Sequence, residues 1–255
     1  MSNLEDRVKK EIEKTGLTTE IKVTKILKDN DWSVHNEYPY LDAEENKIRL
    51  LDIKAVKYIL TPNESDNSST SKSSCELYIE CKKSTKQSWV FYTETVPYSY
   101  LELTLDKLVA ESFGKVFNAS IESEKNAQIN IFTRIPTKFK KLDYRVALSH
   151  KTIFGEKDDF YNAQMQILKA LHHEASLEEI TKEMTIIPII IFDGNLFECN
   201  YKLNELHVTK TNYTRYLSYG LPSQEIPALI DVVALEHFPK YIKMIEKEFH
   251  LSSSN

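Results

Sequence analysis

The sequence predicts an α/β protein built around one mixed β-sheet that is flanked by helices. Segments with apolar residues at helical spacing alternate along the chain with short β-branched runs, as in proteins whose helices cover a sheet. The chain has 255 residues, which is long enough to bury a sizeable core. Neither an internal repeat nor a convincing linker is visible, so residues 1–255 are expected to form a single α/β domain.

Two helices are expected at the start of the chain. An apolar residue recurs at every fourth position over residues 3–14, which predicts an amphipathic helix that Gly16 stops. A threonine then caps a second helix, and Glu20 lies on or beside the apolar stripe of that helix. Glu20 either points inward, toward a site, or is a first-turn glutamate favoured by the helix dipole.

Three strands are expected next, over residues 32–40, 48–60 and 76–83, with a turn around residues 44–46. Residues 62–74 are nearly all Ser, Asn, Thr, Asp and Lys, which predicts a mobile Ser-rich loop. The two strands that this loop separates can still be neighbours in the sheet.

The remainder of the chain continues the alternation of helices and strands. Asp193-Gly194 follows the most apolar run of the sequence and is a strong signal for the tight turn of a hairpin. Helices are expected over residues 100–113, 159–174 and 240–249, and strands over residues 128–134, 185–192 and 228–235.

Composition excludes several classes of protein. The net charge of −5 argues against a protein that coats nucleic acid through bulk electrostatics, although local recognition is compatible with it. No apolar run approaches the ~20 residues that cross a bilayer, so no membrane association is expected. The three cysteines form no CxxC pair, which fits a reducing compartment, and we expect a cytoplasmic protein without structural zinc.

The chemistry of the chain is concentrated in two neighbouring predicted strands. Asp52 lies in the first strand, and Glu80 and Lys82 project from the same side of the second, because side chains alternate with period two. If the strands pair, two carboxylates and one ammonium converge where a hard divalent ion could bind. An E-x-K sequence is also common on solvated strands. Here, however, apolar neighbours predict burial, and a buried charge needs compensation.

Three segments that carry these residues resemble one known family. The helix TGLTTEIKVTKILKDNDWSV, the strand NKIRLLDIKA and the strand LYIECKKS are similar to the opening helix, the aspartate strand and the E-x-K strand of the PD-(D/E)xK nucleases. The Mrr-like and Holliday-junction-resolvase-like branches are the most similar. The resemblance covers roughly residues 15–90. Two departures are that Leu51 replaces the family's proline and that the Ser-rich insertion exceeds a tight hairpin.

The resemblance implies a restriction-endonuclease-like fold and Mg²⁺-dependent (or Mn²⁺-dependent) hydrolysis of DNA phosphodiester bonds. It implies four metal-binding positions, which are Asp52, Glu80, the backbone carbonyl of Cys81 and, through a water, Glu20. It also implies that Lys82 orients the attacking water and stabilises the developing negative charge. Because two carboxylates should keep this lysine protonated, we expect an electrostatic role before a general-base role.

Residues next to the motif could contact DNA, and a symmetric homodimer would suit cleavage of both strands. The expected phosphate contacts are Lys83, Ser84 and Lys86. Two alternatives to the nuclease remain open at this point. One is a non-catalytic module that keeps the fold and binds nucleic acid or a protein, and the other is an α/β protein whose acids and lysine form a buried ion-pair network.

Overall fold

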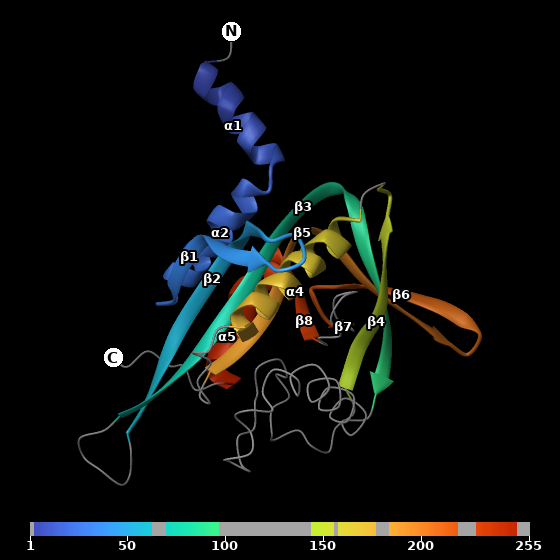
Figure 1. Cartoon of the computed structure of the whole chain (residues 1–255). Helices are drawn as coiled ribbons and strands as arrows, with labels where there is room; N and C mark the ends of the chain where they lie inside the picture. Colours follow the sequence, from blue (N-terminus) through green and yellow to red (C-terminus); the bar gives the residue numbers. More distant parts are fainter. Residues whose placement is uncertain are drawn as a thin grey trace.

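A computed structural model shows how the described part of the chain is arranged (Figure 1). The described residues are 3–62, 70–96, 144–155, 158–176, 184–218 and 228–248. The predicted helix over residues 100–113 and the predicted strand over residues 128–134 lie outside them. Within them the fold is mixed α/β, as predicted, with helices packed on a large mixed sheet.

Most predicted elements are present, with shifted ends. The elements are α1 (Leu4–Lys14), α2 (Leu17–Lys28), β1 (Ser33–Asp42), β2 (Lys47–Pro62), β3 (Thr70–Val96), β4 (Tyr144–Ile153), α4 (Asp159–Ser176), β5 (Met184–Lys202), β6 (Glu205–Thr211), β7 (Tyr213–Ser218), β8 (Ala228–Ala234), a short 3₁₀ helix (Leu235–His237) and α5 (Phe238–Glu248).

The eight described strands form one sheet in the order β1-β2-β3-β4-β7-β8-β5-β6, and β3 also pairs with β5. This additional pairing closes β3, β4, β7, β8 and β5 into a five-stranded ring, which the sequence did not predict. β3 makes the closure possible because it is long. Its first part pairs with β2, its last part pairs with β4, and β5 runs parallel to both parts.

Helices cover both faces of the sheet. α4 packs on one face over a core rich in aromatic rings, in which the rings of Trp89 and Phe192 stack with centroids 3.8 Å apart. α2 and α5 pack on the other face through an aliphatic core that includes Val23, Leu27 and Ile245. In Figure 1, α4 crosses the sheet between β1 and β4. The strand β3, which carries Glu80 and Lys82, contributes side chains to both cores and is thus covered by helices on both faces.

The predicted hairpin turn at Asp193-Gly194 is wrong. β5 continues through both residues, and the turn into β6 comes at Leu203 and Asn204, whose φ angles of 51° and 66° fit a tight two-residue turn. Gly194 is required for a different reason. A Cβ there would lie 2.5 Å from a ring carbon of Phe192 and 2.9 Å from the carbonyl oxygen of Ser84. The glycine thus permits the close approach of β3 and β5.

Gly194→Ala is therefore expected to destabilise the protein by about 1–3 kcal/mol, as overpacking does, because the backbone of Ser84 must move. Gly16→Ala is the matched control, since its Cβ would meet nothing closer than 3.6 Å. Urea unfolding of both variants measures the difference in the free energy of unfolding. An equal stability of the two variants would contradict the prediction.

The strands extend into the predicted Ser-rich loop at both ends. β2 and β3 stay paired as far as Pro62 with Thr70, so residues 70–74 lie in a strand, while residues 63–69 lie outside the described residues. Ladder hydrogen bonds come from the main chain, and polar side chains are therefore no obstacle to them. The insertion thus does not prevent the two motif strands from pairing.

The N-terminal helix differs from the others because it has no buried residue. α1 extends away from the sheet, and its apolar residues Leu4, Val8 and Ile12 are exposed (Figure 1). Among the helices that the structure describes, none has the length and apolar character needed to span a membrane. The three cysteines are free thiols.

Candidate functional site

The site is built where the hydrogen-bond ladders on both sides of Asp52 are interrupted. Toward β3, the last backbone pair is Ile53 with Ile79. Toward β1, Glu37 is the residue opposite Asp52, but these two residues do not pair, although the residues on either side of them do. The φ of Glu37 is 51°, in the left-handed region that costs a residue with a side chain about 1 kcal/mol or more. Asp52 is thereby freed from regular pairing within the sheet.

Side chains replace the lost ladder bonds at this point. The Asp52 carboxylate accepts a hydrogen bond from the backbone N–H of Cys81, with an Oδ2 to N distance of 2.7 Å. The backbone N–H of Asp52 donates to Oε1 of Glu80 at 3.4 Å. These two contacts bring the carboxyl groups of adjacent strands together, as the sequence predicts.

Lys82 joins this pair from the α4 side of the sheet. Its Nζ lies 2.8 Å from Oε2 of Glu80 and 3.3 Å from Oε1 of Gln166 on α4. Burial and the nearby charge of Asp52 raise the pKa of Glu80 to about 8. Burial favours a lower pKa for Lys82, but the Glu80 carboxylate outweighs it and the pKa is raised. Lys82 is therefore protonated at neutral pH.

Glu20 approaches the site from α2. Burial and the charge of Asp52 raise its pKa above the usual range. The point where a side chain at Gly16 would begin lies 3.6 Å from Oε1 of Glu20 and 4.0 Å from the carbonyl oxygen of Cys81. The Glu20 carboxyl group and the carbonyl of Cys81 thus both lie near Gly16, and Glu20 is close enough to Asp52 and Lys82 to feel their charges, as expected if it faces the site.

Two of the three side chains predicted to contact phosphate, those of Lys83 and Ser84, have other partners in the structure. Nζ of Lys83 donates to the carbonyl oxygen of Glu13 at 2.6 Å and to the hydroxyl of Thr18 at 3.0 Å, so it ties β3 to the connection between α1 and α2. The hydroxyl of Ser84 accepts the backbone N–H of Lys86 and of the next residue, which makes a local turn. The Lys86 side chain is exposed. Their contacts with nucleic acid remain a prediction.

The donor set suits a hard cation in chemistry and charge. The carboxylates of Asp52, Glu80 and Glu20 and the backbone carbonyl of Cys81 are oxygen ligands of the kind that Mg²⁺ prefers, and among the described residues the ammonium of Lys82 pairs with Glu80. Among the residues that the structure describes, however, no group of three or more His, Cys, Asp or Glu side chains is placed so that it could hold a metal ion. The arrangement is that of an acid-rich site in which Lys82 donates a hydrogen bond to Glu80.

Two residues near the site were not predicted from the sequence. Gln166 is a polar residue on the sheet-facing side of α4, where Lys169 and Glu174 also make ion pairs with the sheet. Polar residues at helical spacing on an inward face are the signal that could have identified it. The position of Glu37 depends on the register between β1 and β2, for which the sequence has no local signal.

Comparisons of the chain with protein-family models, with curated proteins and with solved structures gave no match.

Proposed function

We propose that this protein is a Mg²⁺-dependent nuclease of the restriction-endonuclease-like, PD-(D/E)xK type that hydrolyses phosphodiester bonds of DNA. One observation carries the proposal. A buried Glu80, paired with Lys82, lies beside Asp52 at the point where Asp52 leaves the regular ladder. Burying the carboxyl group of Glu80 beside a second, half-buried carboxylate is costly, and the left-handed backbone of Glu37 opposite Asp52 adds to the cost. Such costs are typical of functional sites.

The residues of the site would have two different roles in such a reaction, metal binding and stabilisation of negative charge. Asp52, Glu80, Glu20 and the carbonyl of Cys81 would hold Mg²⁺ (or Mn²⁺). When bound, the ion would lower the pKa of a coordinated water and offset negative charge on the phosphate. Lys82 is protonated and donates a hydrogen bond to the attacking water or to a phosphate oxygen, which stabilises the charge that develops there. Its role is electrostatic, because a protonated amine is not a base.

Substrate contacts would come from the residues that follow the motif. Lys86 is exposed next to the site, and Lys83 and Ser84 would have to exchange their present contacts for phosphate oxygens. A protein with a net charge of −5 depends on such local contacts. A cleavage assay on duplex, branched and single-stranded DNA and on RNA, with Mg²⁺, Mn²⁺ or a chelator, tests the proposal. Failure to cleave any substrate with either metal would overturn it.

Mg²⁺ is expected to raise the melting temperature of the wild-type protein by several degrees, since ligand at 100 times its Kd adds about 2.7 kcal/mol. Asp52→Asn should lose this shift because it removes a charged oxygen ligand. Asp29→Asn, an exposed acid at the end of α2, is the control and should keep the shift. Thermal unfolding with and without Mg²⁺ measures the effect. Equal shifts in both variants would show that Asp52 does not bind the ion.

A second candidate is a non-catalytic module that keeps this fold and binds nucleic acid or a protein. The observation that favours it is that no group of three acidic, histidine or cysteine side chains among the described residues is placed to hold a metal. Under this reading DNA binds without cleavage in any divalent salt. If Mg²⁺ and Mn²⁺ affect neither stability nor DNA binding, the acids and the lysine form a structural ion-pair network.

A further inference from the structure

The ammonium of Lys82 is held from two directions. Glu80 on the same strand accepts one hydrogen bond at 2.8 Å, and the side-chain carbonyl of Gln166 on α4 accepts another at 3.3 Å. An ammonium has three N–H donors. Within the part of the chain that the structure describes, two of these donors have a protein partner, and the third can donate to a phosphate oxygen or a water. The direction of this third donor is determined by the other two contacts.

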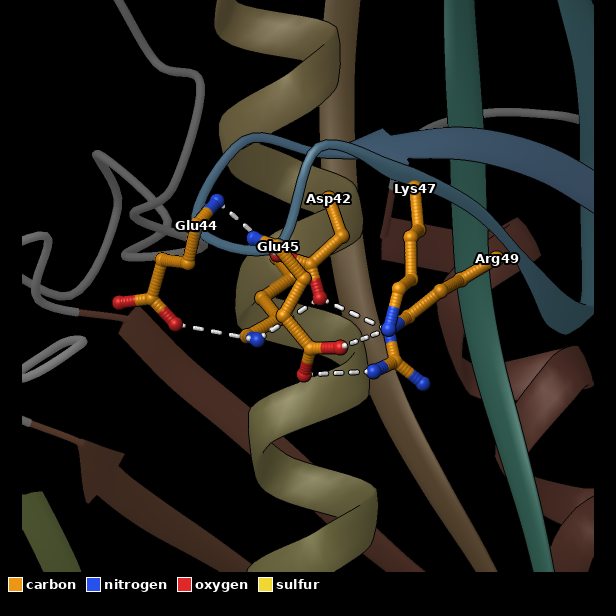
Figure 2. A network of polar contacts seen from close by, with 6 residues as sticks. Asp42, Glu44, Glu45, Lys47 and Arg49 are labelled. Carbon is orange, nitrogen blue, oxygen red and sulfur yellow. Dashed lines mark hydrogen bonds and ion pairs between the residues drawn. The ribbon is translucent and has the colours of Figure 1, made fainter.

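Ion pairs fix α4 over the motif strand. Lys169, one turn after Gln166, donates to Asp42 at 2.8 Å. Asp42 is fully buried and also accepts a hydrogen bond from Arg49 at 2.8 Å, and Figure 2 shows it within the network at the β1–β2 turn. Burial opposes the ionised form of Asp42, but the hydrogen bonds from Lys169 and Arg49 outweigh it and lower its pKa. The network is therefore charged and persistent at neutral pH.

A second ion pair holds the end of the same helix. Glu174 accepts a hydrogen bond from Lys54 of β2 at 3.1 Å, and both side chains are about one-tenth exposed. The helix is thus anchored to both β1 and β2, and its Gln166 is presented to Lys82 on β3.

We propose that Gln166 is a positioning residue that aims Lys82 at the substrate. This inference rests on the proposed nuclease function, because it assigns Gln166 a role in that reaction. Gln166 need not touch the DNA or the metal. Its side-chain oxygen accepts a hydrogen bond from the ammonium, so Lys82 is held between Gln166 and Glu80 and does not turn toward Glu80 alone.

Gln166→Leu tests the proposal because it removes the acceptor and keeps the approximate volume. The expected result is a fall in kcat of about tenfold, the usual minimum for loss of a supporting contact, with unchanged KM for DNA and unchanged Mg²⁺ dependence. Gln166→Glu keeps an acceptor oxygen at the same position and should restore most of the wild-type kcat. If Gln166 were only structural, Gln166→Leu would lower the melting temperature without a selective fall in kcat that Gln166→Glu restores.

Gln164→Leu is the matched control, two positions earlier on α4. The Gln164 amide donates a hydrogen bond to the hydroxyl of Ser218 on β7 at 2.8 Å, so this side chain contacts a strand of the ring and not Lys82. This variant should lose stability and keep its kcat. If Gln166→Leu and Gln164→Leu have the same kcat, the positioning role is overturned.

A measurement independent of activity separates this inference from the proposed function. In NMR spectra of the lysine ammonium groups, the Lys82 signal, assigned with Lys82→Arg, should be protected from exchange in the wild type and exchange faster in Gln166→Leu. If the Lys82 signal is protected only when Gln166 is present, but the protein cleaves no substrate, the nuclease function is overturned. The contact between Gln166 and Lys82 is then still supported. Identical exchange in both proteins would overturn the inference itself.

Discussion

Lys82→Ala is expected to abolish Mg²⁺-dependent DNA cleavage, with a loss in kcat of at least about 10²–10³-fold. This is the loss typical when one donor to the developing charge of a transition state is removed. Lys82 is protonated and lies 2.8 Å from Glu80, so it supplies a positive charge beside the acidic residues of the site. The measurement is a single-turnover cleavage assay in Mg²⁺.

The same variant should keep its fold. Removing one partner of a buried ion pair usually costs about 3–5 kcal/mol, because the other charge remains buried. Here the pKa of Glu80 is about 8, so at neutral pH this carboxyl group can hold a proton and avoid that cost. Lys202→Ala, an exposed lysine on the β5–β6 hairpin, is the control for loss of positive charge. Cleavage by Lys82→Ala at the wild-type rate would refute the assignment of Lys82.

The metal-free protein is expected to lose stability as the pH rises from about 5 to 8. The pKa of Glu80 is about 8 in the folded protein and 4.5 in its ordinary state, so the folded state binds the proton more tightly. The stabilisation is complete below pH 4.5 and is lost as the pH rises through 8. Its size is on the order of a few kcal/mol. The raised pKa of Glu20 acts in the same direction.

Glu80→Gln provides the comparison, because an amide stays neutral over this pH range. Its free energy of unfolding should depend less on pH than that of the wild type, and it should be the more stable protein at pH 8. Urea unfolding at pH 5, 6.5 and 8 in the presence of a chelator measures both curves. Parallel curves for the two proteins would show that Glu80 does not titrate with the raised pKa.

The strands and the acids were predictable because the relevant signals are local. Alternation with period two places Glu80 and Lys82 on one face, and the apolar neighbours of Asp52 indicate an internal strand. The structure shows both features, and it brings the two carboxyl groups together. The family resemblance and the nuclease function remain predictions that the biochemical tests above will decide.

The incorrect and missing predictions involve contacts between segments that are distant in sequence. Asp193-Gly194 has the composition of a turn, but the glycine is there because Ser84 of β3 approaches it. Gln166 meets Lys82 only because ion pairs set the position of α4. The closure of the ring likewise depends on β3 pairing with β5, which no local pattern encodes. Basic composition alone could not show that Lys83 has partners within the protein.

The partner of the motif strand has a consequence for how the protein is made. Glu80 is in register with Ile190 of β5, which is translated long after β2 and β3. A nascent chain that has exposed only the first three strands carries every acid of the site and its lysine, yet lacks the strand beside them. Completion of the site, like closure of the ring, must therefore await the synthesis of β5, and an isolated β2–β3 hairpin would lack the strand that pairs with Glu80.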